Sequence, residues 1–336
     1  MQATGRSMGW WAWLAAAAVL VCGAIPARAQ QGTVLRWKWA PDQVLRYRLN
    51  QEMKQVKSGF EEQEVSWTVQ YVIRQEVKSV SDSGIATVEQ TYESGTVSAE
   101  ERPGEKVKYD STKDSDKDKA GHRLIAPYAA FIGKTITFDV GPEGEVPRLT
   151  GASAIVDEAL SKLQTDPMTA MILAQFREAL GDEGMRKDLE LALRVVPDRA
   201  CKTGDHWEVA FDQQMPIVGT LHNAITYKLK KLAGKAGARM ASIDASGKIS
   251  QGAGGGGGGL GALVDVKLKS SKIDGDIIFD ADAGHITQSG YSIDSEWEFA
   301  LKGGGGDDGG DLLPGEATPM KGTQKLQQRA RLELIR

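Results

Sequence analysis

The sequence is poor in the residues that most often hold metals or form disulfide bonds. It has two cysteines and four histidines in 336 residues. The histidines stand alone at positions 122, 206, 222 and 285, with no pair at helical or hairpin spacing, so the chain offers no recognisable ligand set for a transition metal. The cysteines lie at 22 and 201, and only Cys201 remains if the N-terminal segment is removed. No intrachain disulfide is then possible, and stability must come from an ordinary hydrophobic core.

Catalytic and cofactor motifs are missing as well. The chain has no G-x-S-x-G turn, no local Ser, His and Asp pattern, and no glycine loop that leads through Lys and Ser or Thr into a helix. Cys201, with Lys202 beside it and His206 nearby, is a weak candidate for a Cys-His site around Asp205. Because this stretch reads better as a loop before a strand, we expect no catalytic, cofactor-binding or metal-binding residues.

The chain also lacks a basic surface. Its formal net charge is −4, and removal of the N-terminal segment, which carries two arginines and no acid, makes the charge more negative. Nucleic acids and anionic lipid surfaces are bound through clustered lysines and arginines. We therefore expect neither of them as a partner.

The first 29 residues are typical of an export signal. Arg6 supplies a positive charge, residues 8–25 are apolar and uncharged, and Ala27-Arg28-Ala29 supplies the small residues of a cleavage site. We expect residues 1–29 to be a signal peptide, the mature chain to begin at Gln30, and the protein to be periplasmic or extracellular.

Two alternatives to a cleaved signal remain open. The apolar run is about the shortest that can span a bilayer, so it could be a retained anchor, although Pro26 and the cleavage pattern follow it directly. Lipidation at Cys22 is a weaker alternative, because Val21 stands where a small residue is expected. No later run is long enough to cross a membrane as a helix.

Most of the remaining chain alternates apolar and polar residues with a period of two. Leu45, Tyr47 and Leu49, for example, alternate with Arg46 and Arg48. Such alternation is typical of antiparallel strands with one face on a core and one face in water. It predicts strands at 35–39, 45–49, 65–73, 85–92, 135–140, 221–229, 263–269, 291–301 and 326–334.

Residues 151–196 break this period and predict helices. Ile155, Val156 and Leu160 fall on one stripe, and Asp166-Pro167 would begin a second helix. A third stripe, with Leu189, Ala192, Leu193 and Val196, ends at Pro197. The methionines of the second helix could line a ligand pocket, although packing against a sheet is the commoner use of such a stripe.

These patterns predict a mainly β protein of the α+β class, with a large curved antiparallel sheet and a central group of helices packed on one face. Residues 30–336 would form a single exported domain, with β halves at 30–150 and 197–336 on either side of the helical segment. The charged stretch 101–121 and the glycine-rich tracts 252–261 and 303–319 are expected to be flexible loops.

The two β halves contain hairpins of similar sequence. Ile136-Thr-Phe-Asp139 leads through a short turn to Gly144, and Ile277-Ile-Phe-Asp280 leads through a turn to Gly284. A duplication that produced two related halves would explain the likeness. The alternative is that Phe-Asp, a turn and Gly suit many unrelated hairpins.

The second of these turns, DADAG at 280–284, begins like a calcium loop. An EF-hand loop needs Gly at its sixth position and Glu at its twelfth, and here these positions hold His285 and Tyr291. We therefore expect Asp280 to cap a hairpin turn rather than to bind calcium.

The order of these fragments resembles an uncharacterised family of exported bacterial proteins, the domain of unknown function numbered 6263. The resemblance covers most of the mature chain, including the LRWKW segment at 35–39, Tyr109-Asp110-Ser111, Ile132-Gly133-Lys134 and the Phe279-Asp280 hairpin. It implies no functional residues, because the family has no established activity. A fainter likeness, of fold alone, is to periplasmic lipoprotein-carrier proteins, whose curved antiparallel sheet surrounds helices and an apolar cavity.

These observations favour a non-catalytic exported binding protein that holds a hydrophobic ligand, such as a lipid, or an envelope partner. A cavity between the sheet and the helices would be lined by Trp67, Tyr71, Met171, Phe176 and Trp297. One alternative is a structural, envelope-associated protein that interacts through its exposed surface or a sheet edge. The other is a hydrolase with an unrecognised site, which would gather perturbed titratable groups in one cleft.

Overall fold

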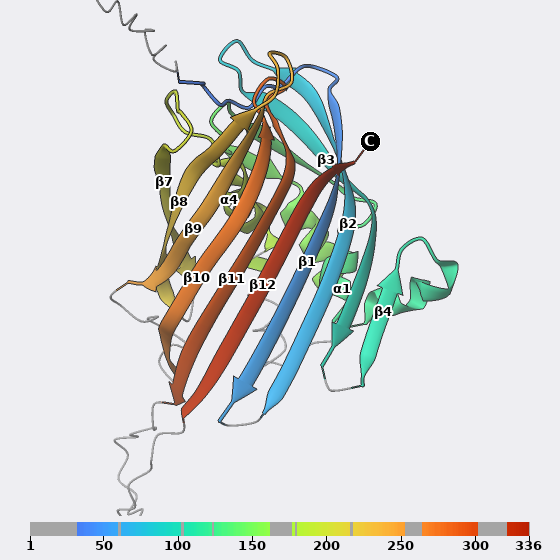
Figure 1. Ribbon diagram of the computed structural model, residues 1–336. Helices are drawn as coiled ribbons and strands as arrows, with labels where there is room; N and C mark the ends of the chain where they lie inside the picture. The colour runs from blue at the N-terminus through green and yellow to red at the C-terminus, as the bar shows by residue number, and fades with distance from the viewer. Residues whose placement is uncertain are drawn as a thin grey trace, which may run out of the picture. The chain divides into compact units, whose positions relative to one another are not determined.

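A long antiparallel sheet dominates the computed structural model of the chain (Figure 1). The structure describes residues 32–59, 62–101, 104–122, 124–161, 177–178, 180–215, 218–252, 264–301 and 321–335. Residues Gly32–Arg336 form one compact unit. The predicted signal peptide at 1–29 lies outside the described residues, and so, apart from Gly252, do the glycine-rich tracts at 252–261 and 303–319.

The sheet contains twelve strands within the described ranges. In sequence order they are β1 (Val44–Ser58), β2 (Gln63–Val80), β3 (Ala86–Glu100), β4 (Lys106–Asp110), β5 (Thr135–Val140), β6 (Arg148–Thr150), β7 (His206–Met215), β8 (Gly219–Ala233), β9 (Met240–Gln251), β10 (Val264–Asp280), β11 (His285–Leu301) and β12 (Lys321–Ile335). Across the sheet the order is β6-β5-β3-β2-β1-β12-β11-β10-β9-β8-β7, with β4 paired to β3 off this path.

The first and last strands are neighbours in the middle of this sheet. β1 and β12 pair antiparallel from Arg46 with Ile335 to Ser58 with Thr323, and Figure 1 shows them side by side. On either side of this pair the strands follow one another as antiparallel meanders. The predicted mainly β class and the large antiparallel sheet are therefore confirmed.

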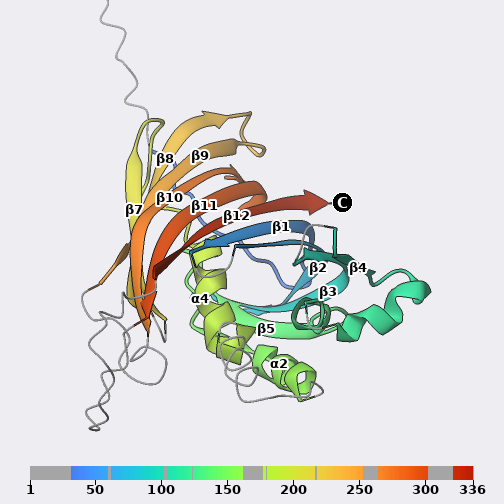
Figure 2. The same ribbon diagram turned by 90° about the horizontal axis from the view of Figure 1, so that it is seen from below.

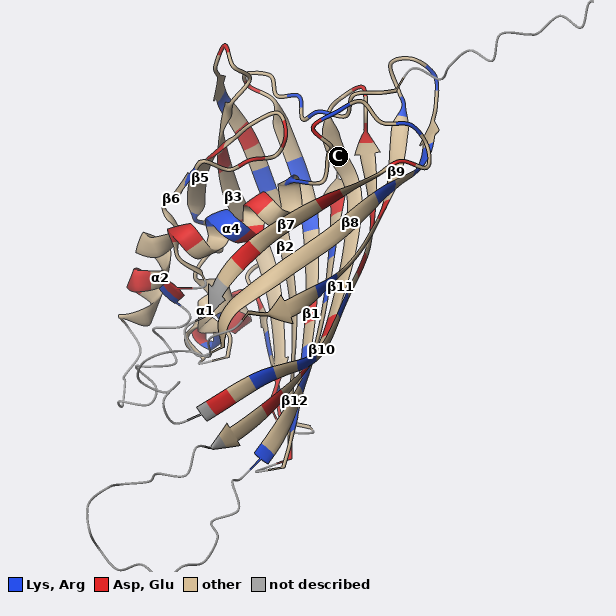
Figure 3. Cartoon of the chain, turned by 90° about the vertical axis from the view of Figure 1, so that its left-hand side faces the viewer, with Lys and Arg blue, Asp and Glu red and all other residues tan. Residues whose placement is uncertain are grey.

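The alternation in the sequence sorts side chains between two faces of the sheet. In β1, Leu45 and Tyr47 are buried, while Arg46 and Arg48 are exposed. In β12, every second residue from Thr323 to Glu333 is exposed. Lysines, arginines and acids are interspersed along the strands (Figure 3), and the buried apolar side chains form one core cluster.

Four helices are described in the structure: the 3₁₀-helix η1 (Asp114–Gly121) and the α-helices α1 (Ala126–Ala129), α2 (Ala152–Leu160) and α4 (Asp182–Leu193). α2 and α4 lie in the segment predicted to be helical, and Figure 2 shows α4 inside the curve of the sheet. The helix predicted after Asp166-Pro167 lies outside the described residues. Packing of the whole helical group on one face therefore stays a prediction.

The segment predicted as a strand at 35–39 is extended but does not join the sheet as a strand. The amide of Trp37 donates to the carbonyl of Pro142 at 3.0 Å, and the amide of Lys38 donates to the carbonyl of Gly284 at 3.0 Å. Pro142 and Gly284 belong to the turns of the two similar hairpins. The alternating pattern is correct for burial, because Leu35 and Trp37 are buried, but the segment bonds to two turns instead of one neighbouring strand.

The charged stretch at 101–121 is not an unstructured loop, which corrects the prediction from composition. It contains β4, which pairs with β3, and η1, in which Asp116 is buried and binds Lys119 at 2.6 Å. Val107 and Tyr109 pack against the core. Two apolar side chains in a short alternating run were enough to add an edge strand despite the surrounding charge.

Candidate ligand cavity

A cavity of about 340 Å³ lies between the sheet and helix α4. Side chains of β1, β2, β3, β11 and β12 form one wall, and α4 supplies Met185, Leu189, Ala192 and Leu193 on the other. Trp37, α1 and Phe131 contribute further apolar surface. The wall is thus mostly aliphatic and aromatic, as is usual for sites that bind small organic molecules.

The strands reach the cavity through residues that share one side of the pleat. Tyr47, Leu49 and Gln51 stand at every second position of β1, and Tyr71, Ile73 and Gln75 do so in β2. Side chains of a strand alternate between faces, so these six all point the same way. The same rule that buries Tyr47 therefore also brings Gln51 and Gln75 into the wall.

Trp37 links the start of the described chain to the end of α4. Its indole Nε1 donates to the carbonyl of Leu193 at 2.8 Å. Its ring stacks on Trp39 with centroids 5.5 Å apart and meets Phe279 edge-on at the same distance. The bond to Leu193 holds the last turn of α4 against the extended segment, and Trp37 itself is part of the cavity wall.

Tyr47, Tyr71 and Tyr92 in the wall are neutral, and their hydroxyls are hydrogen-bonded. The hydroxyl of Tyr47 donates to the carbonyl of Ile286 at 3.1 Å, and that of Tyr71 donates to the carbonyl of Tyr128 at 2.8 Å. Burial raises the pKa of Tyr92 to about 12, and it also raises the pKa values of Tyr47 and Tyr71. These hydroxyls therefore keep their protons throughout the physiological pH range.

Two glutamines and a tyrosine form a polar chain in the wall. Gln75 Nε2 donates to Gln90 Oε1 at 2.8 Å, and Gln90 Nε2 donates to the hydroxyl of Tyr92 at 3.1 Å. Gln90 is almost completely buried. A buried amide needs such partners, because an unpaired polar group away from water is costly. This series of hydrogen bonds places oriented polar groups at an otherwise apolar surface.

Among the residues that the structure describes, Asp188 is the only charged side chain in the cavity wall. It lies on α4 three residues after Met185 and four before Ala192, so it shares their stripe on the helix. Its side chain is accessible and lines the cavity, yet the protein around it removes enough water to raise the pKa of its carboxyl to about 6. Among the described residues the structure gives this carboxyl no hydrogen bond or ion pair.

The residues predicted from the sequence lie in different places. Tyr71 is in the cavity wall. Trp67 lies four residues before Tyr71 on β2 and packs against the core. Trp297 is half-buried on β11, where its Nε1 donates to Ser295 Oγ at 2.9 Å. Neither tryptophan is part of the wall. Met171 and Phe176 lie outside the described residues.

Two polar residues of the wall, Gln51 and Asp188, were not predicted from the sequence, although the position of each within an apolar pattern pointed to it. Gln51 follows Tyr47 and Leu49 in the inward register of β1, where a polar residue is unexpected. Asp188 sits at helical spacing within an apolar stripe, beside Leu189. A polar residue on an apolar face is more informative than the apolar residues around it.

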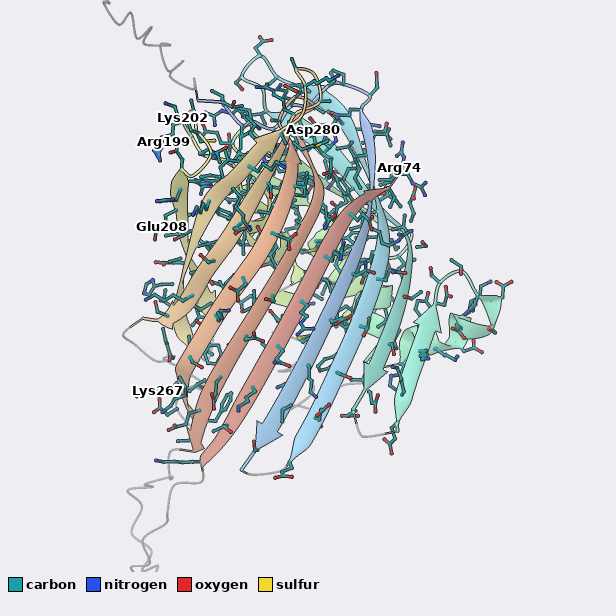
Figure 4. The ribbon with its side chains drawn as sticks, in the orientation of Figure 1. Arg74, Arg199, Lys202, Glu208, Lys267 and Asp280 are labelled. Atoms are coloured by element: carbon teal, nitrogen blue, oxygen red, sulfur yellow. The ribbon has the colours of Figure 1, made fainter. Side chains whose placement is uncertain are left out.

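The residues around Cys201 do not resemble an activated thiol site. Cys201 is buried, and its backbone exchanges hydrogen bonds with Thr33 at 2.8 and 2.9 Å. Burial raises the pKa of its thiol, and the charge of Asp205 raises it further. Asp205 accepts a hydrogen bond from the amide of Lys202 at 2.9 Å, and Figure 4 shows Arg199 and Lys202 at the periphery near β7. A catalytic thiol needs the opposite shift of pKa.

The turn at 280–284 confirms the predicted role of Asp280, which Figure 4 places at one end of the sheet. Its Oδ1 accepts hydrogen bonds from the amides of Asp282 at 3.0 Å and Ala283 at 2.7 Å. Asp282 pairs with Arg239, whose hydrogen bonds lower the pKa of that carboxyl to about 2. Within the described ranges, no three His, Cys, Asp or Glu residues are grouped to hold a metal ion.

Comparison with known proteins identifies a family and only distant structural likenesses. The family of unknown function DUF6263 matches residues 83–286, which confirms the resemblance noted in the sequence. The comparison with curated proteins gives no match. Of the helices that the structure describes, none has the length and apolar character needed to span a membrane.

Three solved structures illustrate how distant the likenesses are. One is titled "Lipid-protein interactions in lipovitellin": its TM-score is 0.39, its identity is 12%, and the match covers 89% of this chain and 26% of that chain. DynF from the dynemicin biosynthesis pathway of Micromonospora chersina has a TM-score of 0.17 at 8% identity, over 90% and 85% of the two chains. The COG4313 outer membrane channel from Pseudomonas putida F1 has a TM-score of 0.22 at 6% identity, over 89% and 97%. The chain thus spans about a quarter of the lipovitellin structure, and none of these scores establishes a shared fold.

Proposed function

The chain belongs to DUF6263, a family of unknown function, and we propose that it is a non-catalytic binding protein that holds one small, mainly hydrophobic molecule in its cavity. The proposal includes export from the cytoplasm after cleavage before Gln30. It also includes a role for the helical segment at 151–196 in covering the inner face of the sheet. The cavity is the observation that carries the proposal.

The size of the cavity fits a small ligand. Its volume of about 340 Å³ lies in the range of small-molecule sites, which begins near 300 Å³. If each non-hydrogen atom occupies the space of one liquid water, about 30 Å³, the cavity accommodates about eleven such atoms. Protein interiors are otherwise close-packed, so a space of this size is unusual as a packing fault.

The composition of the wall supports the same proposal. Its aromatic and aliphatic side chains would bury the apolar body of a ligand, and each buried CH₂ group contributes about 0.8 kcal/mol. The polar chain from Gln75 to Tyr92 and the carboxyl of Asp188 are placed to orient a polar end. An apolar pocket with a few convergent polar groups is the usual arrangement of a binding site.

Recovery of a natural ligand tests the proposal directly. The full chain would be purified from the envelope of its own cells without detergent and measured by native mass spectrometry before and after denaturation. We expect one co-purifying molecule of roughly a dozen non-hydrogen atoms that is released on unfolding. A protein that is free of any small molecule, and that also fails to bind 1-alkanols of six to fourteen carbons, would contradict the proposal.

A further inference from the structure

The acids of α4 and its N-terminal turn differ in whether they have partners. Asp182 accepts a hydrogen bond from the amide of Ser153 at 3.0 Å. Glu183 and Glu190 both pair with Arg186, at 2.8 and 2.7 Å. Asp188 has no such partner among the described residues, although it lies on the same helix. Its position on the cavity side, away from Arg186, separates it from the ion pairs that satisfy the others.

An unpaired carboxyl in an apolar wall costs stability. Removal of water from a charged group is unfavourable unless a partner replaces that water. A neutral or apolar residue at position 188 would fit the stripe of Met185, Leu189 and Ala192 better. Residues that reduce stability in this way are commonly those that function requires.

We propose that the cavity selects molecules whose apolar body ends in a cationic amine, and that Asp188 binds the amine. This inference rests on the proposed function and specifies its ligand class. An ammonium group provides both the opposite charge and the hydrogen-bond donors that the carboxylate lacks. The aromatic rings of the wall, such as those of Tyr71 and Tyr92, add favourable contact with a cation.

No other group in the described wall competes with Asp188 for this role. The remaining titratable side chains there are five tyrosines, whose pKa values are all raised by burial: Tyr47, Tyr71, Tyr92, Tyr128 and Tyr291. They stay neutral between pH 4 and pH 8, so Asp188 alone changes charge in that range. An anionic ligand end would meet a like charge, and a neutral end would gain no ionic contact.

Three probes of equal chain length separate charge from shape. Decylamine, 1-decanol and decanoate share an apolar body of the size that the cavity accepts, and decylamine is protonated at pH 7.5, as a lysine side chain is. Binding to the full chain would be measured by isothermal titration calorimetry below the micelle concentration. We expect decylammonium to bind at least about tenfold more tightly than decanol, since a hydrogen bond to a charged group is worth a factor of this order. Decanoate should bind most weakly.

The variant Asp188→Asn assigns the preference to this residue. It should lose the preference for decylammonium over decanol. Asp118→Asn, which removes the same charge at an exposed position of η1, should behave as the unmodified chain. At pH 4.5 the unmodified chain should also lose much of its preference, because the Asp188 carboxyl is then largely protonated.

The outcomes separate the inference from the proposed function. Equal binding of decylammonium and decanol to the unmodified chain, or a preference that persists in Asp188→Asn, would overturn the role of Asp188 and leave a binding cavity. Failure of all three probes to bind would overturn the proposed function itself. The comparison of the probes on the unmodified chain does not depend on how well the variant folds.

Discussion

The indole Nε1 of Trp37 donates a hydrogen bond to the carbonyl of Leu193, 2.8 Å away, across 156 residues of sequence. Leu193 is the last residue of α4, where helix carbonyls lack partners within the helix. The amide of Val195 also donates to this carbonyl, at 2.8 Å, so the indole is its second donor and ties the end of the helix that carries Asp188 to Trp37. It also joins α4 to the extended segment that bonds to both similar hairpins.

Replacement of Trp37 by Phe tests the value of this bond. We expect Trp37→Phe to lower the free energy of unfolding in urea by about 1 kcal/mol more than the loss of ring volume does. Trp39→Phe is the matched control, because Trp39 is the stacked neighbour and its Nε1 is buried without a partner in the described structure. Equal losses in the two variants would show that the bond to Leu193 contributes nothing.

The raised pKa of Asp188 predicts a pH-dependent effect on stability. The folded state holds the proton up to about pH 6, and the unfolded state releases it near the ordinary value of 3.8. The folded protein therefore has no penalty from the Asp188 carboxyl below pH 4. The free energy of unfolding falls as pH rises from 4 to 6, because the folded state must then ionise this carboxyl. Because the side chain still reaches water in the cavity, we expect a discounted penalty of about 1 kcal/mol above pH 6.

Asp188→Asn removes that penalty. Without ligand, the variant should melt about 2 °C or more above the unmodified chain at pH 7.5, and at the same temperature at pH 4. Thermal unfolding followed by circular dichroism at the two pH values measures both quantities. A destabilised variant at pH 7.5 would mean that the charged carboxyl has a favourable partner in the folded protein.

A large side chain on the sheet wall should block the cavity. Ala330 lies on β12 and lines the cavity, so Ala330→Trp would occupy much of its volume. We expect a loss of at least about tenfold in affinity for 1-decanol, with the melting temperature changed by only a few degrees. Gln327→Trp places the same ring on the exposed face of β12 and should bind decanol as the unmodified chain does.

The turn at 280–284 requires glycine for two separate reasons. Gly284 has a φ of +73°, and a Cβ there would lie 2.6 Å from the backbone nitrogen of Lys38. Gly237 has a φ of +90° with no atom within 4 Å of its Cβ position. We expect Gly237→Ala to cost about 1–2 kcal/mol from the backbone alone, and Gly284→Ala to cost about 1–3 kcal/mol more from the clash. The free energies of unfolding in urea of the two variants measure the difference. Equal losses would show that the close approach of Lys38 adds no cost at position 284.

The local pattern predicted strands far better than it predicted their partners. The alternation at 135–140 identified β5 to the residue, and the alternation at 45–49 identified part of β1. Nothing in either stretch indicates that β1 lies beside β12, because pairing between distant strands depends on the whole chain. The segment at 35–39 shows the same limit, since alternation reports burial and says nothing of what the backbone bonds to.

The cavity could be anticipated in kind but not in its residues. Tyr71 was placed in its wall because it shares the inward face of a predicted strand. Asp188 was missed because an acid on a helix usually faces water; its side chain is exposed here too, and only the position of α4 beside the sheet places it at the cavity. The position of a void depends on how side chains of different elements meet, which no single element encodes.

The pairing of β1 with β12 has a consequence for how the protein folds. Met53 Sδ accepts a hydrogen bond from Gln328 Nε2, and the two residues are 275 positions apart. Within each meander, paired strands follow one another along the chain, but the seam between β1 and β12 must wait for β12. Loop closure over that distance is entropically costly, and proteins dominated by such contacts fold slowly. Until the seam forms, the free backbone groups of β1 are exposed and can pair with another chain. Pairing with β12 covers this edge and so prevents aggregation through β1.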